Sequence, residues 1–392
     1  MDFNEKLAVI KKLSKERKIR IMIIGLGSVG NYLLDYLASS NDEEIEVIVV
    51  GRNEAKMVSD VNIVRVAALI RGRIKNRVTV VSDVDLNDVD SITDCLKEYD
   101  PDIIVNSSRA YAGLKYGSIS WKNIRAYGVW SPLSIKYIRN IMVAYDDAGS
   151  HAIVINTSYS DAVNAWIKSA GFTAPDLGSG NINHLIPRIK YSISEICGIE
   201  DYWNIDLTYA TSHFHDVVIS KEGQDEGVEQ MFVATYGGKV LDLDKADVLS
   251  RCSISMPTDA KRNMMNASSN FEIIRAILSA IRDGSKVKLH CPGPFGEIGG
   301  YPVIIDGSGN DPVGYIDESV FSLDEMRSKN RSSIYLDGIE DVRGGSLVYT
   351  DELLEKVRSA FGTDLPKEVP FEDIDIVAGQ IVSEIIEKYR GA

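Results

Sequence analysis

The chain has no long hydrophobic run, although apolar residues make up 44% of its 392 residues. No stretch reaches the ~18 apolar residues that a membrane-spanning helix requires, so we expect a protein that does not enter a membrane. Residues 1–20 are charged throughout and lack the apolar core of a signal peptide. This segment predicts a short amphipathic helix and a cytoplasmic location.

Cysteine and positive charge are also scarce. The four cysteines (Cys95, Cys197, Cys252 and Cys291) are scattered without a CxxC pair, which is typical of a reducing compartment and excludes a recognisable zinc ribbon. Lys and Arg number 43 against 57 Asp and Glu, which gives a net charge of −14. This balance offers no basic face for a phosphate backbone, so nucleic acid is not an expected partner.

Proline is rare as well, with 11 residues, while the apolar content is that of a folded protein. Disorder is therefore excluded, and a globular chain of two domains is expected.

The most informative feature is the segment Arg20–Gly30, an apolar run that ends in a glycine-rich turn. A helical pattern and a second apolar run, Ile45–Val50, follow it. This order predicts the first strand–helix–strand unit of a dinucleotide-binding sheet. The alternative is a doubly wound domain that binds no phosphate. The residues expected to contact the cofactor here are Gly25, Leu26, Gly27, Ser28, Val29 and Gly30.

Short apolar strands alternate with helical patterns over the first 160 residues or so, which predicts a parallel sheet covered on both faces. After Asn156 longer helices alternate with segments that read as antiparallel strands. We therefore expect an α/β protein whose Rossmann domain (1–157) precedes an α+β substrate domain (158–392).

The end of the second strand selects the cofactor. Enzymes that use NAD place an acidic residue there to bind the ribose 2′-hydroxyl, but this chain has Gly51, Arg52 and Asn53. A guanidinium in place of a carboxylate favours a 2′-phosphate, so NADP is predicted and NAD remains possible. The alternative is that Arg52 is a solvated surface residue. Ser107 and Arg109, at the end of the fourth strand, are also expected to contact the cofactor.

The segment LGSGNINHLIPRIKYSISEICGI (177–199) resembles the lactate/malate dehydrogenase superfamily, which also contains the family-4 glycoside hydrolases. The resemblance implies that Arg188 binds a substrate carboxylate, whose two oxygens suit a guanidinium fork. The alternative is an arginine paired with a surface Glu. The resemblance also implies that Asn156 contacts substrate and nicotinamide, although an asparagine at a strand end is equally a turn residue.

The same resemblance implies a catalytic histidine near YATSHFHDVVIS (209–220), where His213 and His215 would share one face if the segment is extended. It also implies that Arg125 polarises the substrate carbonyl, within a mobile loop (111–130) that closes over the substrate. The aromatic residues of that loop indicate either a larger, more apolar substrate than pyruvate or ordinary packing.

One expected residue is missing, because Leu185 stands where the dehydrogenases have the aspartate that orients the histidine. Asn183, His184 or Asp216 are candidates for that role. The glycosidase branch would need a cysteine near 181–184, which is absent, although His184 with His213 or His215 could form a metal pair. No metal site is assigned.

Together these features predict an NADP(H)-dependent oxidoreductase that transfers a hydride to or from a small, carboxylate-bearing substrate of the 2-hydroxy acid or 2-keto acid type. The alternatives are an opine- or imine-forming reductase, a family-4-like glycosidase that needs nicotinamide and a metal, and a nucleotide sensor without enzymatic activity. The resemblance also implies a homo-oligomer, a dimer or a tetramer.

Overall fold

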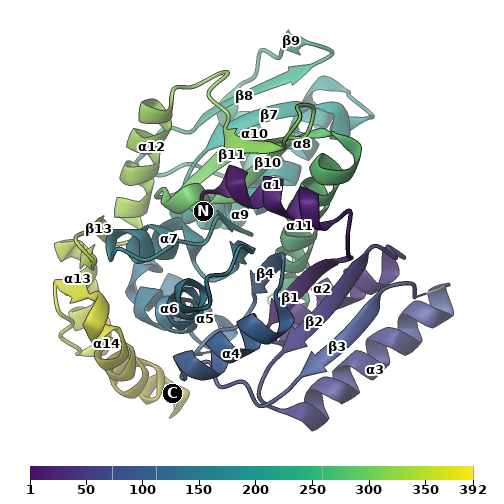
Figure 1. The fold of residues 1–392 in the computed structure, drawn as a ribbon. Helices are drawn as coiled ribbons and strands as arrows, with labels where there is room; N and C mark the ends of the chain where they lie inside the picture. Colours follow the sequence, from purple (N-terminus) through teal and green to yellow (C-terminus); the bar gives the residue numbers. More distant parts are fainter. Residues whose placement is uncertain (73, 112, 258, 392) are drawn as a thin grey trace.

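The computed structural model describes the whole chain except residues 73, 112, 258 and 392. Its centre is a parallel sheet of six strands in the order β3-β2-β1-β4-β5-β6, as the sequence predicted (Figure 1). The order reverses between β1 and β4, so a crevice opens at the carboxyl ends of these strands. The strands are β1 (Ile19–Ile24), β2 (Ile45–Val50), β3 (Arg77–Val81), β4 (Ile103–Asn106), β5 (Ile153–Asn156) and β6 (Leu177–Gly178).

Helices cover both faces of this sheet, because successive residues of each strand point to opposite sides. In β1, Met22 and Ile24 join one apolar core, and Ile21 and Ile23 join the other. The second core is closed by α1 (Phe3–Leu13), α2 (Ser28–Ser39), α3 (Glu54–Arg71) and α11 (Asn263–Asp283). The first core is closed by α4 (Val89–Tyr99), α5 (Gly113–Asn123), α6 (Ser131–Ala148), α7 (Ser160–Ser169), α13 (Asp351–Phe361) and α14 (Ile374–Gln380).

The remaining strands form three small antiparallel sheets. Two of them lie at the top of the view in Figure 1, and the third lies beside α7. The helices that bear on the site are α8 (Ile182–Cys197), α9 (His213–Glu222) and α12 (Leu323–Leu336). The strands are β7 (Asp206–Ala210), β8 (Met231–Tyr236), β9 (Lys239–Val240), β10 (Lys286–Pro292), β11 (Gly300–Asp306), β12 (Val313–Ile316), β13 (Ile339–Arg343), β14 (Ser346–Tyr349) and β15 (Glu368–Pro370).

Two local expectations are wrong. The predicted loop 111–130 contains the helix α5 and a short 3-10 turn, and its aromatic residues pack inward: the rings of Tyr116 and Trp130 stack 4.8 Å apart. The segment 209–220 is not extended, because α9 begins at His213, so His213 and His215 do not share a face. The parallel sheet also takes its last strand, β6, from beyond residue 157. The division into 1–157 and 158–392 stays a prediction.

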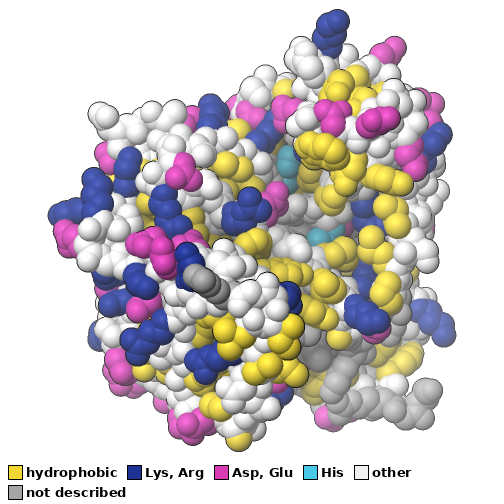
Figure 2. Space-filling model, turned by 90° about the vertical axis from the view of Figure 1, so that its right-hand side faces the viewer, with side chains coloured by type: hydrophobic (Ala, Val, Ile, Leu, Met, Phe, Trp, Pro, Cys, Tyr) yellow, Lys and Arg dark blue, Asp and Glu magenta, His cyan; other side chains and the backbone are white. Residues whose placement is uncertain are grey.

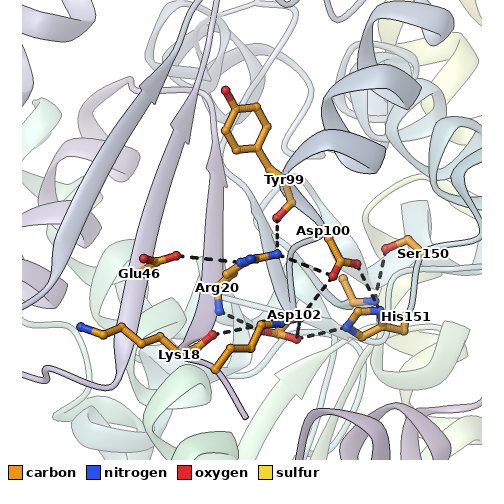
Figure 3. Close-up of polar contacts among 10 residues, drawn as sticks. Lys18, Arg20, Glu46, Tyr99, Asp100, Asp102, Ser150 and His151 are labelled. Atoms are coloured by element: carbon orange, nitrogen blue, oxygen red, sulfur yellow. Dashed lines mark hydrogen bonds and ion pairs between the residues drawn. The ribbon is translucent and has the colours of Figure 1, made fainter. Parts of the chain in front are cut away.

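A buried polar cluster lies at the amino end of the sheet, opposite the crevice (Figure 3). Its centre is the fully buried Asp102, which accepts hydrogen bonds from the backbone N–H of Arg20 (2.8 Å) and from Arg17 Nη1 (2.6 Å), and which lies 3.1 Å from His151 Nε2. Burial alone would raise the pKa of Asp102, but the contacts with His151 and Arg17 hold that pKa below its usual value. The cluster joins the start of β1 to the starts of β4 and β5.

A buried ion pair attaches α1 to the sheet. Lys6 Nζ lies 2.8 Å from Asp176 Oδ2, and both side chains are buried. Asp176 Oδ2 also accepts the backbone N–H of Val154 in β5 (2.8 Å). No helix among the described residues is long and apolar enough to cross a bilayer.

We expect Lys6→Met to lower the free energy of unfolding by about 3–5 kcal/mol, because it leaves the buried Asp176 carboxylate without its cation. Urea denaturation at pH 7 measures the change. Lys12→Met, on the exposed face of the same helix, is the matched control and should lie within about 0.5 kcal/mol of the wild type. Equal stability of the two variants would contradict this prediction.

Candidate functional site

The glycine turn after β1 is shaped by contacts that exclude a side chain. Gly25 has a φ of +92°, and a Cβ added there would lie 2.9 Å from the backbone of Ser108. A Cβ on Gly30 would lie 2.3 Å from the carbonyl oxygen of Gly25. A Cβ on Gly27 would meet no atom within 4 Å, so this residue faces open space. Two glycines therefore serve the packing of strand, turn and helix, and Gly27 leaves room for a ligand.

That open space lies at the amino end of α2. Gly27 is the N-cap of this helix and supplies no side-chain hydrogen bond. The first N–H groups of a helix have no partner within it, so those of Ser28, Val29 and Gly30 are available to an anion, whose charge the helix dipole also favours. Leu26 is buried in the core and contributes only its backbone. These features fit the pyrophosphate of a dinucleotide.

The tip of β2 is adjacent to this turn, because Ile24 and Val50 pair in neighbouring strands. Asn53 is used structurally, since its side chain accepts the N–H of Lys56 (3.0 Å) and caps α3. Arg52 is exposed, and no ion pair of Arg52 occurs within the described parts of the chain. Its charge helps to lower the pKa of Asp85, and its guanidinium is exposed to a ligand at this edge of the sheet.

Ser107 and Arg109 also lie at this edge of the sheet. Ser107 Oγ donates to the carbonyl oxygen of Gly25 (2.6 Å) and so closes the glycine turn. Arg109 Nη2 donates to the carbonyl oxygen of Thr157 (3.2 Å), which follows β5. Both residues support the crevice, and Arg109 remains exposed beside it.

Of the two predicted histidines, His213 is the one whose side chain contacts a carboxylate. Its Nδ1 lies 2.8 Å from Oδ2 of the fully buried Asp337, which follows α12. The same carboxylate accepts the hydroxyl of Tyr159 (2.6 Å) and the backbone N–H of Tyr127 (2.7 Å). The rings of both tyrosines contact the imidazole edge-on. This arrangement fixes the proton on Nδ1 and leaves Nε2 for chemistry.

Asp337 therefore offers His213 the carboxylate contact that Leu185 cannot. Burial by itself would lower the pKa of His213, but the charge and the hydrogen bond of Asp337 raise that pKa above its usual value. Sequence reasoning considered Asn183, His184 and Asp216 for this role and missed Asp337. No local signal marks it, because Asp337-Gly338 reads only as the end of a helix.

His215 has a different environment. Its Nδ1 lies 2.6 Å from Ser333 Oγ, and its Nε2 lies 3.0 Å from the carbonyl oxygen of Glu226. The side chain is fully buried, and burial lowers its pKa to about 4. Both ring nitrogens are therefore occupied by the protein, and the imidazole stays neutral near pH 7.

Arg188 is buried on α8 with only 4% of its surface exposed, and no carboxylate pairs with it in the described structure. Nη1 donates to the carbonyl oxygen of Cys252 (2.8 Å), Nη2 contacts Met256 Sδ (3.1 Å), and Nε has no partner. Burial lowers its pKa, while the charge of Asp216 acts in the opposite direction. The alternative of a surface Arg–Glu pair is not what the structure contains.

Two other predicted residues are already engaged. Arg125 forms a bidentate pair with Glu222 and a further ion pair with Glu226, and it lies 4.6 Å from the Trp121 ring. Asn156 is fully buried at the end of β5, where its amide exchanges hydrogen bonds with the side chains of Asn106 and Asn164 (both 3.0 Å). Neither side chain has a polar group left over for a substrate.

Two further side chains of the candidate site, Asp161 and His184, have polar atoms without partners among the described residues. Asp161 is fully buried and accepts from Asn181 through Oδ2, while its Oδ1 is unpaired. Burial raises the Asp161 pKa to about 6, against the attraction of His213. His184, one turn before Arg188 on α8, has an unpaired Nε2. Figure 2 shows a hollow between apolar side chains on one face of the molecule, with a histidine visible in it. Unpaired atoms of this kind indicate a polar ligand.

The described residues contain no group of three or more His, Cys, Asp or Glu that could hold a metal ion. His184 Nδ1 lies 3.8 Å from Asp216 Oδ2, which is too long for a hydrogen bond.

We expect Asp337→Asn to lower the His213 pKa by about one unit or more, because the variant loses the negative charge. NMR titration of the His213 ring, assigned with His213→Gln, measures it. Folding raises this pKa, so the contact stabilises the protein fully below pH ~6.5, and the gain is lost as pH rises through the folded value. His215 is the internal control, since it should not titrate above pH 5. An unchanged His213 midpoint would contradict the assignment.

Comparison with known proteins supports the cofactor end of the site. The family model of the saccharopine dehydrogenase NADP-binding domain matches residues 21–119, which include the glycine turn and Arg52. None of the curated proteins matches the chain.

Solved structures are similar over most of the chain. The lactate dehydrogenase of Cryptosporidium parvum, in complex with lactic acid and nicotinamide adenine dinucleotide, superposes with a TM-score of 0.53 at 13% identity, over 82% of this chain and 96% of its own. The malate dehydrogenase of Plasmodium falciparum gives 0.51 at 13% identity, over 81% and 99%. The malate dehydrogenase of Aeropyrum pernix gives 0.50 at 18% identity, over 80% and 95%. The chain therefore carries a nicotinamide-dinucleotide-binding Rossmann domain within the fold of the lactate and malate dehydrogenases.

Proposed function

We propose that the chain is an NADP(H)-dependent oxidoreductase. It transfers a hydride to or from the carbonyl or hydroxyl carbon of a small, carboxylate-bearing substrate, of the 2-keto acid or 2-hydroxy acid type. The observation that carries the proposal is the contact of His213 with buried Asp337, in a chain whose residues 21–119 match an NADP-binding domain. An acid–base group held in one tautomer is what carbonyl reduction requires.

The bound nicotinamide supplies or accepts the hydride at the substrate carbon. His213 carries the accompanying proton: in reduction Nε2–H gives its proton to the carbonyl oxygen as the carbon receives the hydride, and in oxidation neutral Nε2 takes the hydroxyl proton. The Asp337 carboxylate stabilises the imidazolium, which is the form of His213 that protonates the oxygen. The raised pKa of His213 keeps that form populated closer to neutral pH.

Arg188 binds the substrate carboxylate in this proposal. Its guanidinium is buried without an ion pair among the described residues. Burying an unpaired charge is unfavourable in free energy unless an anion binds to it. The charge of Asp216 raises the pKa of both Arg188 and His213, so this carboxylate lies near both side chains. The mechanism leaves out His215, Arg125 and Asn156, because contacts within the protein already use their polar atoms.

A second candidate is an opine- or imine-forming reductase, in which an amine replaces the carbonyl oxygen. The observation that favours it is the unpaired Oδ1 of Asp161, a buried carboxyl oxygen beside His213 that would accept a hydrogen bond from an ammonium or iminium group. The match to a saccharopine dehydrogenase domain model agrees with this alternative.

A homo-oligomer remains a prediction. A candidate contact surface is the outer face of α3, where apolar side chains are exposed at helical spacing. They are Val58, Ile63, Val66, Leu69 and Ile70.

We expect wild-type protein to bind NADPH more tightly than NADH, and Arg52→Ala to weaken NADPH binding about tenfold, because one charge-assisted contact to the 2′-phosphate is lost. Titration of nicotinamide fluorescence measures both affinities. Arg77→Ala removes an exposed arginine at the opposite end of the sheet and should change neither. Wild-type protein that binds NADH as tightly as NADPH would contradict the cofactor assignment.

We expect turnover of one or more 2-keto acids with NADPH, and a loss of about 100-fold or more in kcat/KM for Arg188→Gln with unchanged NADPH binding, because the substrate loses its carboxylate partner. The assay compares 2-keto acids alone, 2-keto acids with amino acids, and aryl glycosides, each with and without a divalent cation. Turnover only with an amine present would support the second candidate. Metal-dependent cleavage of glycosides would overturn both.

A further inference from the structure

A second polar cavity, of about 330 Å³, lies on the other side of α8 from Arg188. It is enclosed by α8, the start of β7, α11 and β10. α8 contributes Asn183, Ile186 and Lys190 to the cavity, while His184 and Arg188 face the candidate active site. At 100° per residue these two sets point roughly 150° apart, so the cavity is separate from that site. Its volume suits a small organic molecule.

The deepest polar group of the cavity has no partner. His290 on β10 is 5% exposed, and its Nε2 makes no hydrogen bond within the described structure. Burial lowers its pKa to about 3, so the ring is neutral and each nitrogen needs a hydrogen bond of its own. A buried ring nitrogen without a hydrogen bond destabilises the fold, and a polar ligand atom at this position would supply the missing bond.

The cavity holds two lysines with different surroundings. Lys288 is saturated, because its Nζ contacts Asp206 (3.2 Å), Asp317 (3.2 Å) and Thr208 Oγ1 (2.6 Å). Lys190 has no direct ion pair or hydrogen bond among the described residues; burial lowers its pKa, and the more distant charges of Asp206 and Glu272 act in the opposite direction. The Nζ of Lys190 therefore has its direct contacts left for one anionic group.

The cavity also has apolar and aromatic lining residues. Ile186, Leu207 and Leu289 are buried beneath the cavity. Trp203 stands at its edge with 63% of its surface exposed, held edge-on by the ring of Tyr202 at 5.4 Å. An exposed indole at the mouth of a cavity offers a flat surface for stacking. Asp206 and Glu272 also line the cavity and would repel a ligand with several negative charges.

We propose that this cavity binds a small aromatic monocarboxylate. Its carboxylate pairs with Lys190, its ring packs against Trp203 and the aliphatic floor, and a polar ring atom or substituent reaches His290 Nε2. A single free cation together with two acidic neighbours selects one negative charge, and the aromatic edge selects a planar body. The site does not depend on the proposed function.

Isothermal titration calorimetry of the full chain tests the proposal with nicotinate, whose ring nitrogen can reach His290, and with benzoate, nicotinamide and inorganic phosphate. We expect saturable binding of nicotinate, weaker binding of benzoate, and none of nicotinamide or phosphate. Lys190→Gln should weaken nicotinate binding about tenfold, and Lys190→Arg should restore most of it, because the charge returns. Lys239→Gln, an exposed lysine on β9, is the matched control and should change nothing.

Arg188→Gln separates this cavity from the candidate active site, which also offers a cation to a carboxylate. Nicotinate binding that survives Arg188→Gln and is lost in Lys190→Gln supports the proposal, and the reverse pattern overturns it. Binding of phosphate as strong as that of nicotinate, or no saturable heat with nicotinate, also overturns it. The indole N–H signal of Trp203, one of four tryptophans, should shift with nicotinate in the wild type, which does not depend on how well any variant folds.

Discussion

Asp337 joins four parts of the chain at one buried carboxylate. Its oxygens receive hydrogen bonds from Tyr127, Tyr159 and His213, and its own backbone carbonyl accepts the N–H of Gly128 (2.8 Å). A Cβ on Gly128 would lie 2.5 Å from that carbonyl, so only glycine permits the approach. A buried carboxylate is costly unless its lone pairs are filled, and here each contact that fills one also fixes an element of the candidate site. The position of His213 therefore depends on this single residue.

The parts of the molecule that could be predicted from the sequence are those whose contacting residues lie close together along the chain. The strand, glycine turn and helix at 19–39 are adjacent in sequence, and two of the three glycines, Gly25 and Gly30, have a steric reason in this local structure. The contact of Asp337 with His213 spans 124 residues and leaves no local trace, so it could not be predicted without the tertiary structure. The error at α5 has a similar cause, because its aromatic residues are determined by partners such as Trp130 rather than by local periodicity.

The two arginines of interest illustrate how surroundings decide the use of a charge. Arg125 and Arg188 are equally plausible from the sequence. Arg125 meets two glutamates, which complete its charge, whereas Arg188 is buried beside a carbonyl and a thioether that do not. Residue type and spacing suggest which side chains can bind an anion. The neighbouring acidic residues then determine which of these side chains still lacks an ion-pair partner.

The long separation between His213 and Asp337 has a consequence for synthesis of the chain. The glycine turn and the first five strands are complete once residue 156 has left the ribosome, so a dinucleotide surface can form early. The histidine gains its carboxylate only after α12 has been made, when more than four fifths of the 392 residues exist. The glycine turn is thus made early and the contact between His213 and Asp337 late, so the candidate site stays incomplete until the fold around it is nearly closed.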